Sequence, residues 1–325
     1  MKPSLLFAAF AFALLIQLTN ASEGDRSYEF FHCVTICSLT TCSPDQSLPL
    51  TLRLTFWTCP QNCEYTCMHR ITDAAKLSDD PILQYYGKWP FHRFLGIQEP
   101  ASVLFSLGNG YMHLRHWSVL RQKIPLTYHL RPYYLSWVVV GVNSWLWSAV
   151  FHTRDFNLTE KLDYYSAALS ILYALFFAVV RILRLRSPIL IGAWGMLCLA
   201  CYTAHVSYLS FVRFDYHYNI IANGAVAVLH NLFWLTWSAW QYTSWSHAKG
   251  GNRAFAWYPA AGVVLVSLAM ALEVFDFPPY WGVFDAHSLW HLSTIPLIPI
   301  WHRFMLEDTR FEVEVGKRED KMRKD

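Results

Sequence analysis

The feature that most constrains this chain is a series of apolar stretches, each about 20 residues long, that follows Pro90. A helix needs about 20 predominantly apolar residues to cross the hydrocarbon core of a bilayer. The first stretch is the weakest because Ser106, Asn109 and His113 interrupt it, so six spans are the alternative to seven. We therefore predict an all-α polytopic membrane protein with a bundle of seven transmembrane helices in residues 96–303. The predicted spans lie near residues 97–116, 133–152, 163–182, 187–210, 217–239, 254–275 and 284–303.

The composition supports a membrane protein. Charged residues make up 15% of the chain, against about 25% in soluble globular proteins. Aromatic residues make up 17% and include 15 Trp, and Trp and Tyr are enriched at membrane interfaces. The net charge of +3 is too small to indicate a nucleic-acid binder. We expect membrane lipids among the partners and no nucleic acid.

Residues 1–21 have the pattern of a secretory signal peptide. Lys2 provides a positive start, residues 5–16 are apolar, and Thr19-Asn20-Ala21 provides a small-residue cleavage site. A first transmembrane helix is the alternative, but the apolar run is too short for one and a long polar stretch follows it. The mature chain is therefore expected to begin in the lumen of the secretory pathway.

The polar segment at residues 22–95 contains six of the eight cysteines. A segment of this size struggles to bury a sufficient core of its own. An even number of cysteines behind a signal peptide indicates disulfides in an oxidising compartment, here three, and the sequence does not choose among the possible pairings. A zinc module is the alternative, although the spacings lack the usual Cys-x2-Cys knuckle. The disulfide candidates are Cys33, Cys37, Cys42, Cys59, Cys63 and Cys67.

The basic residues of the loops predict the orientation of the spans, because Lys and Arg favour the cytosolic side. With a luminal N-terminus, the cytosolic loops hold nine basic residues and the luminal loops hold three. The tail at residues 304–325 is then cytosolic, and the Asn157-Leu158-Thr159 sequon is a luminal glycosylation candidate. The nine are Arg115, Arg121, Lys123, Arg131, Arg181, Arg184, Arg186, Lys249 and Arg253, and the three are Arg154, Lys161 and Arg213.

Histidines gather at the predicted luminal ends of the helices. His287 and His291 are four residues apart, so they lie one above the other on one helix face. His152, at the luminal end of the second span, is a candidate third ligand, and three His with an open position are typical of catalytic zinc. Ser148 lies one turn from His152, and Asp163 lies across the next loop, where it could orient or deprotonate a water.

Chance is the alternative explanation for this pattern, because the chain contains 14 His. Ionisable groups inside a membrane are costly, however, and are by default functional candidates. His113 and His116, near the predicted cytosolic end of the first span, have no carboxylate in the neighbouring short loops. We expect these two to face lipid headgroups.

The ordered set of Ser148, His152, Asp163, His287 and His291 resembles the seven-helix membrane hydrolases that include alkaline ceramidases and adiponectin receptors. The Cys-rich segment and the stretch Glu99-Pro100-Ala101-Ser102-Val103-Leu104-Phe105-Ser106 look more closely like one branch. That branch is the Per1-like, or post-GPI-attachment to proteins factor 3, family.

The resemblance implies a zinc-dependent hydrolase with a seven-helix fold. The implied Zn2+ ligands are His152, His287 and His291, with Asp163 acting on the water and Ser148 helping to stabilise the oxyanion. The implied substrate is the lipid of GPI-anchored proteins, which loses its unsaturated sn-2 acyl chain. The implied location is the Golgi membrane, with the endoplasmic reticulum as a second location. Glu273, Asp276 and Asp285 are candidate partners for the ligand imidazoles, and at least two of the three are expected instead to be solvated carboxylates at the membrane interface.

Three other functions remain open on the sequence alone. A ceramidase-like amidase would use the same kind of site, because sequence does not separate ester from amide cleavage. A seven-helix receptor could hold a structural zinc ion. A non-enzymatic cargo factor could hold GPI-anchored proteins through the Cys-rich segment.

Overall fold

The computed structural model describes residues 22–43, 47–245 and 254–322, and the predicted signal peptide at residues 1–21 lies outside them. The chain divides into two compact units. The first comprises Met1–Leu104, His152–Asp155 and Met270–Trp290, and the second comprises Phe105–Phe151, Phe156–Ala269 and His291–Asp325. Four continuous helices, α5, α6, α10 and α11, contribute residues to both units.

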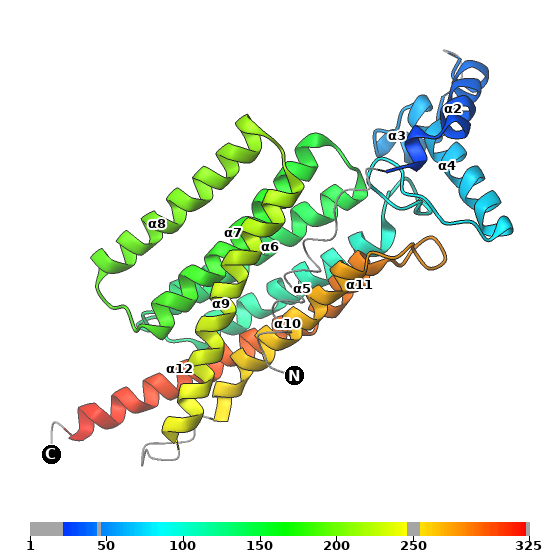
Figure 1. The fold of residues 1–325 in the computed structure, drawn as a ribbon. Coiled ribbons are helices and arrows are strands. Elements are labelled where there is room, and N and C mark those ends of the chain that lie inside the picture. The colour runs from blue at the N-terminus through cyan, green and yellow to red at the C-terminus, as the bar shows by residue number, and fades with distance from the viewer. Residues whose placement is uncertain (1–21, 44–46, 246–253, 323–325) are drawn as a thin grey trace. The chain divides into compact units, whose positions relative to one another are not determined.

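The first unit is built on two helices that lie side by side, α2 (Tyr28–Thr41) and α4 (Cys59–Ser78) (Figure 1). Ser27 caps α2 by accepting a hydrogen bond from the Phe30 backbone N–H at 3.2 Å. Thr58 and Gln61 cap α4 reciprocally, side chain to backbone, which is the arrangement of a capping box. Two short helices, η1 (Gly24–Arg26) and α3 (Leu50–Leu54), complete the helical part of the N-terminal segment.

Three disulfides join α2 to the start and middle of α4, which confirms the predicted use of the six cysteines. The pairs Cys33–Cys67, Cys37–Cys63 and Cys42–Cys59 are nested, as expected for a ladder between two antiparallel helices. Because every thiol of this segment is consumed, the zinc-module alternative is excluded. A small apolar core of Phe30, Cys67 and Tyr85 lies beside the ladder. The disulfides supply the stability that so small a core lacks.

The remaining helices confirm an all-α membrane fold. Among the described residues, five stretches are long and apolar enough to cross a membrane: Arg131–Thr153, Asn157–Ile182, Pro188–Val212, Tyr216–Thr243 and Ala254–Glu273. They coincide with the second to sixth predicted spans. They belong to α6 (Arg131–Thr153), α7 (Asn157–Ile182), α8 (Pro188–Ser207) with the π-helical turn η2 (Tyr208–Val212), α9 (Tyr216–Trp245), and the turn η3 (Ala254–Ala256) with α10 (Trp257–Phe275).

The first and last predicted spans differ from these five. The first is α5 (Pro100–Lys123), whose interrupting side chains Ser106, Asn109 and His113 are all buried in the second unit. The last is two helices, α11 (Ala286–Thr294) and α12 (Leu297–Met322). Pro296 separates them, because proline has no backbone N–H and its ring disfavours a helical residue before it. The count of seven is therefore not reproduced by length and apolarity alone.

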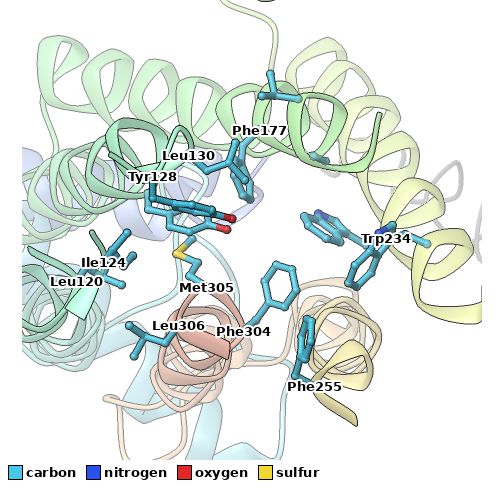
Figure 2. Packing of buried hydrophobic residues seen from close by; sticks show 14 of the residues in the cluster. Leu120, Ile124, Tyr128, Leu130, Phe177, Trp234, Phe255, Phe304, Met305 and Leu306 are labelled. Atoms are coloured by element: carbon cyan, nitrogen blue, oxygen red, sulfur yellow. The ribbon is translucent and has the colours of Figure 1, made fainter. Parts of the chain in front are cut away.

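The core of the second unit gathers around α12. The ring centroid of Phe304 lies 5.1 Å from that of Trp234 on α9 and 6.3 Å from that of Phe255 (Figure 2). One turn after Phe304 on α12, the buried Asp308 carboxylate accepts hydrogen bonds from Arg181 Nε at 2.6 Å and from the Tyr134 hydroxyl at 3.0 Å. The helix therefore continues, well packed, beyond residue 303.

Candidate metal centre

In the first unit, the side chains of two histidines point toward each other, and their Nε2 atoms lie close together. His152 lies in the last turn of α6 and His287 in the first turn of α11, and their Nε2 atoms are 3.3 Å apart. The Nδ1 atom of His152 is 2.7 Å from Glu99 Oε2, and the Nδ1 atom of His287 is 2.8 Å from Glu273 Oε2. A carboxylate only accepts, so each Nδ1 donates, and Nε2 is the ring atom that a neutral imidazole held in this way offers to a metal ion.

This arrangement fits a bound zinc ion. Two Zn–N bonds of about 2.0–2.1 Å at a tetrahedral angle place their nitrogens roughly 3.3 Å apart. A carboxylate on the far nitrogen of a ligating histidine is also the usual way in which proteins fix the ring orientation. Both the donor set and the observed spacing of the Nε2 atoms of His152 and His287 therefore suit the ion.

His291 is the third member of the group, one turn from His287 on α11, and it is buried. His152 and His287 belong to the first unit and His291 to the second, and the three together are the predicted ligand set. Within the second unit, His291 Nδ1 is 3.0 Å from Ser106 Oγ, and Ser106 Oγ is 3.0 Å from Ser148 Oγ. The Asn109 side-chain amide donates to the His291 carbonyl at 2.8 Å, which fixes this turn of α11 to α5.

The other predicted site residues lie on α6 and α7. Ser148 is buried on α6, one turn before His152, in the hydrogen-bonded row described above. Asp163 is half-buried on α7, where its carbonyl accepts from the Ser166 hydroxyl at 2.9 Å, and its part in the chemistry stays a prediction. Asn157, the glycosylation candidate, is exposed as the first residue of α7.

The sequence interpretation missed three residues that hold the ligands. Glu99 was noted only within a family-like stretch, although a carboxylate at the start of an apolar helix is itself unusual. In the sequence, Ser106 and Asn109 interrupt an apolar span and carry no other signal of function by themselves. Their spacing of three residues, with His113 four further on, places all three on one helix face, and that regularity was the available signal.

The three predicted acidic partners have different roles. Glu273 bonds His287, as expected for a ligand's partner. Asp285 caps α11 by accepting from the Ser288 backbone N–H at 2.9 Å. Asp276 is exposed and accepts from Trp89 Nε1 at 2.7 Å and from the Gln84 side-chain amide at 3.1 Å.

The prediction that His113 faces lipid headgroups is wrong. Its ring is buried on α5 and packs against Gly141, where an added Cβ would approach the ring to 2.6 Å. His116 stacks on His302 of α12 with a centroid separation of 4.4 Å. Among the described residues, one other set of side chains has metal-like spacing, Cys42, Cys59 and Cys63, and all three are in disulfides.

Comparison with known proteins shows which sequences this chain resembles. The profile of the Per1-like family matches residues 49–309. A Xenopus laevis protein named GPI-specific phospholipase A2-like PGAP3 is 35% identical over 96% of this chain and 98% of its own length. The human protein of that name is 36% identical over 95% of each chain, and the Schizosaccharomyces pombe Protein PER1 homolog is 38% identical over 96% of this chain and 94% of its own. No solved structure matches the chain significantly.

Proposed function

The chain belongs to the Per1-like family, and on that premise we propose that it is an intramembrane ester hydrolase that removes the unsaturated sn-2 acyl chain of GPI anchors. The observation that carries the proposal is the pair of carboxylate-held imidazoles, His152 and His287, with their Nε2 atoms 3.3 Å apart. Relatives that share almost the full length are named GPI-specific phospholipase A2-like, which supports both the ester bond and the GPI lipid as substrate.

We assign His152, His287 and His291 as the residues that hold a zinc ion, each through Nε2. Zinc, when bound, lowers the pKa of water and polarises a carbonyl group. Glu99 and Glu273 keep two of the rings in the required tautomer and orientation. Ser106 does the same for His291, because it is within hydrogen-bonding distance of Nδ1.

The hydrogen bonds from His291 through Ser106 to Ser148 fix which of these groups donates and which accepts. If His291 binds through Nε2, its Nδ1 carries the proton and donates to Ser106 Oγ. The Ser106 hydroxyl then donates to Ser148 Oγ. This leaves the Ser148 hydroxyl hydrogen for another acceptor, and the oxyanion that forms during attack on the ester carbonyl is the acceptor that the chemistry requires.

The remaining assignments follow the sequence interpretation. Asp163 orients or deprotonates the attacking water. The substrate's glycan and protein are luminal, so the proposal places the site at the luminal side of the Golgi membrane, with the N-terminus in the lumen and the C-terminus in the cytosol. The excess of basic residues in the loops predicted as cytosolic supports that orientation.

The test is a substrate comparison on the purified full-length chain in lipid nanodiscs. A GPI-anchored protein with an unsaturated sn-2 chain, a ceramide and a phosphatidylcholine are supplied separately, and the released fatty acid is identified by mass spectrometry. We expect release from the GPI lipid and none with His291→Ala. Release from ceramide alone would replace the proposal with an amidase, and no release from any lipid would favour a receptor or cargo factor.

A further inference from the structure

The Glu99 carboxylate, which holds His152, is itself held by a lysine of the N-terminal segment. The Lys88 ammonium lies 2.5 Å from Glu99 Oε1 and 3.1 Å from Asp155 Oδ2. The other oxygen of Glu99 receives the His152 hydrogen bond at 2.7 Å. One oxygen of this buried carboxylate therefore contacts the Lys88 ammonium and the other contacts the His152 ring. These contacts connect Lys88 through Glu99 to His152.

Two backbone hydrogen bonds fix the same contact. The Gln98 N–H donates to the Thr153 carbonyl and the Glu99 N–H donates to the His152 carbonyl, both at 3.0 Å. The residue before α5 is thereby joined to the end of α6, and Asp155 is brought within reach of Lys88. The carboxylate of Glu99 has little freedom except about its own side-chain torsions.

Lys88 is positioned by a tight turn that the disulfide-bonded segment supports. Tyr85 and Lys88 exchange backbone hydrogen bonds of 2.8 and 3.0 Å around Tyr86 and Gly87, which both have positive φ angles of 51° and 77°. This is the geometry of a two-residue type I′ turn. The Tyr85 ring is buried with its centroid 5.0 Å from that of Phe30, next to Cys67. The cystine ladder therefore sets where the ammonium lies.

Lys88 stays charged in this place. Burial disfavours the ammonium form, but the Glu99 and Asp155 carboxylates more than offset that effect and raise the pKa of Lys88 above its ordinary value. A buried carboxylate that loses its cation keeps its desolvation cost without the compensating attraction. Without Lys88, Glu99 is therefore expected to leave its position against His152.

We propose that Lys88 is a positioning residue of the metal centre, which acts by holding the Glu99 carboxylate against His152 Nδ1. The inference rests on the proposed function, since it requires His152 to be a zinc ligand. It also gives the Cys-rich segment a role in the hydrolase site, by supplying the cation that the site needs.

The experiment measures zinc in purified full-length protein by elemental analysis after dialysis against graded concentrations of a chelator. We compare wild type with Lys88→Met, Lys88→Arg and Lys76→Met. Lys76 is the matched control, because it lies in the same segment and pairs with Asp73 at the exposed surface. Changes around a ligand's hydrogen-bond partner typically lower metal affinity by about 10–100-fold. We expect a loss of that size for Lys88→Met, recovery of most of it in Lys88→Arg, and no change for Lys76→Met.

A double-mutant cycle shows whether Lys88 acts through Glu99. Lys88→Met added to Glu99→Gln should cause no further loss of zinc, because its target carboxylate is already gone. If Lys88→Met alone fails to fold, the double variant, which buries no unpaired carboxylate, supplies the same comparison with Glu99→Gln. An additional loss in the double variant, or zinc retention by Lys88→Met equal to that of Lys76→Met, overturns the inference. Wild-type protein without zinc would instead refute the proposed function.

Discussion

At the scale of single residues, the three imidazoles of the candidate centre are each fixed through Nδ1, two by carboxylates and one by a serine hydroxyl. Replacing His152, His287 or His291 with Ala should each strongly reduce bound zinc, because each removes one of few ligand bonds. His113→Ala and His116→Ala should keep the ion. Elemental analysis of the purified variants decides between the two groups, and zinc loss confined to the last two would show that the wrong cluster was chosen.

Asp163 is expected to affect turnover without affecting the metal. Asp163→Asn keeps the size of the side chain and removes its charge and basicity. Turnover should fall by roughly 10²–10⁴-fold, the usual contribution of general acid–base catalysis. The measurement is lipid product and zinc content on one preparation. A fully active variant removes Asp163 from the mechanism, and an inactive variant without zinc assigns it to the metal site or the fold.

Ser148 and Ser106 are expected to act in series. Ser148→Ala should lower turnover by up to about 10²-fold if its hydroxyl is a main oxyanion donor, and by less if zinc carries most of the charge. Ser106→Ala removes both the group that orders Ser148 and the partner of His291 Nδ1, so turnover is compared with zinc supplied in excess, where it should still fall. Turnover with the double variant should resemble that of Ser148→Ala alone. Independent, additive losses would contradict the proposed row of hydrogen bonds.

The sequence predicted the histidines of this site and the Glu273 partner of His287, and it missed Glu99, Ser106 and Lys88. The four-residue intervals between Ser148 and His152 and between His287 and His291 are local, so helical geometry alone relates their positions. Glu99 and Lys88 reach the site through a turn and a hydrogen bond between separate segments, and no local period reports such contacts. Ser106 is a polar residue in an otherwise apolar span, and the length and apolarity of a span do not show which of its polar residues face the site.

At the scale of elements, hydropathy located five helices well because each contains an apolar stretch long enough to cross a bilayer. It described α5 and the last span less well, because α5 turns its polar face inward and Pro296 divides the other into α11 and α12. The disulfide pairing could not be predicted from the sequence, because the number and spacing of cysteines do not determine which of them pair. The four-residue spacings Cys33–Cys37 and Cys63–Cys67 make sense only once both segments are known to be helices.

The helix α12 depends on one buried ion pair. Asp308→Ala leaves the Arg181 guanidinium buried without its main carboxylate partner, which typically costs about 3–5 kcal/mol of stability. Glu307→Ala is the control, because Glu307 pairs with the exposed Arg303, and surface pairs contribute about 0–1 kcal/mol. Thermal unfolding in detergent should show a much larger decrease in Tm for Asp308→Ala. Equal Tm values would mean that the pair does not hold α12.

At the scale of the whole molecule, the orientation of the chain is a prediction with a direct test. Nine basic residues in the loops predicted as cytosolic, against three in the others, place the N-terminus in the lumen and the C-terminus in the cytosol. A tag added after Asp325 should be digested by protease in intact microsomes, and a tag after residue 21 should be protected. Protection of the C-terminal tag would reverse the topology and move the histidine site to the cytosolic side.

In the proposed function, a metal held by three histidines makes this chain a GPI-lipid hydrolase. The most direct measurement follows zinc content and release of the sn-2 fatty acid together in one wild-type preparation, during chelation and then during return of zinc. We predict that the two fall and recover in proportion, and that His291→Ala recovers neither. Fatty-acid release that continues after the zinc has been removed would contradict the account.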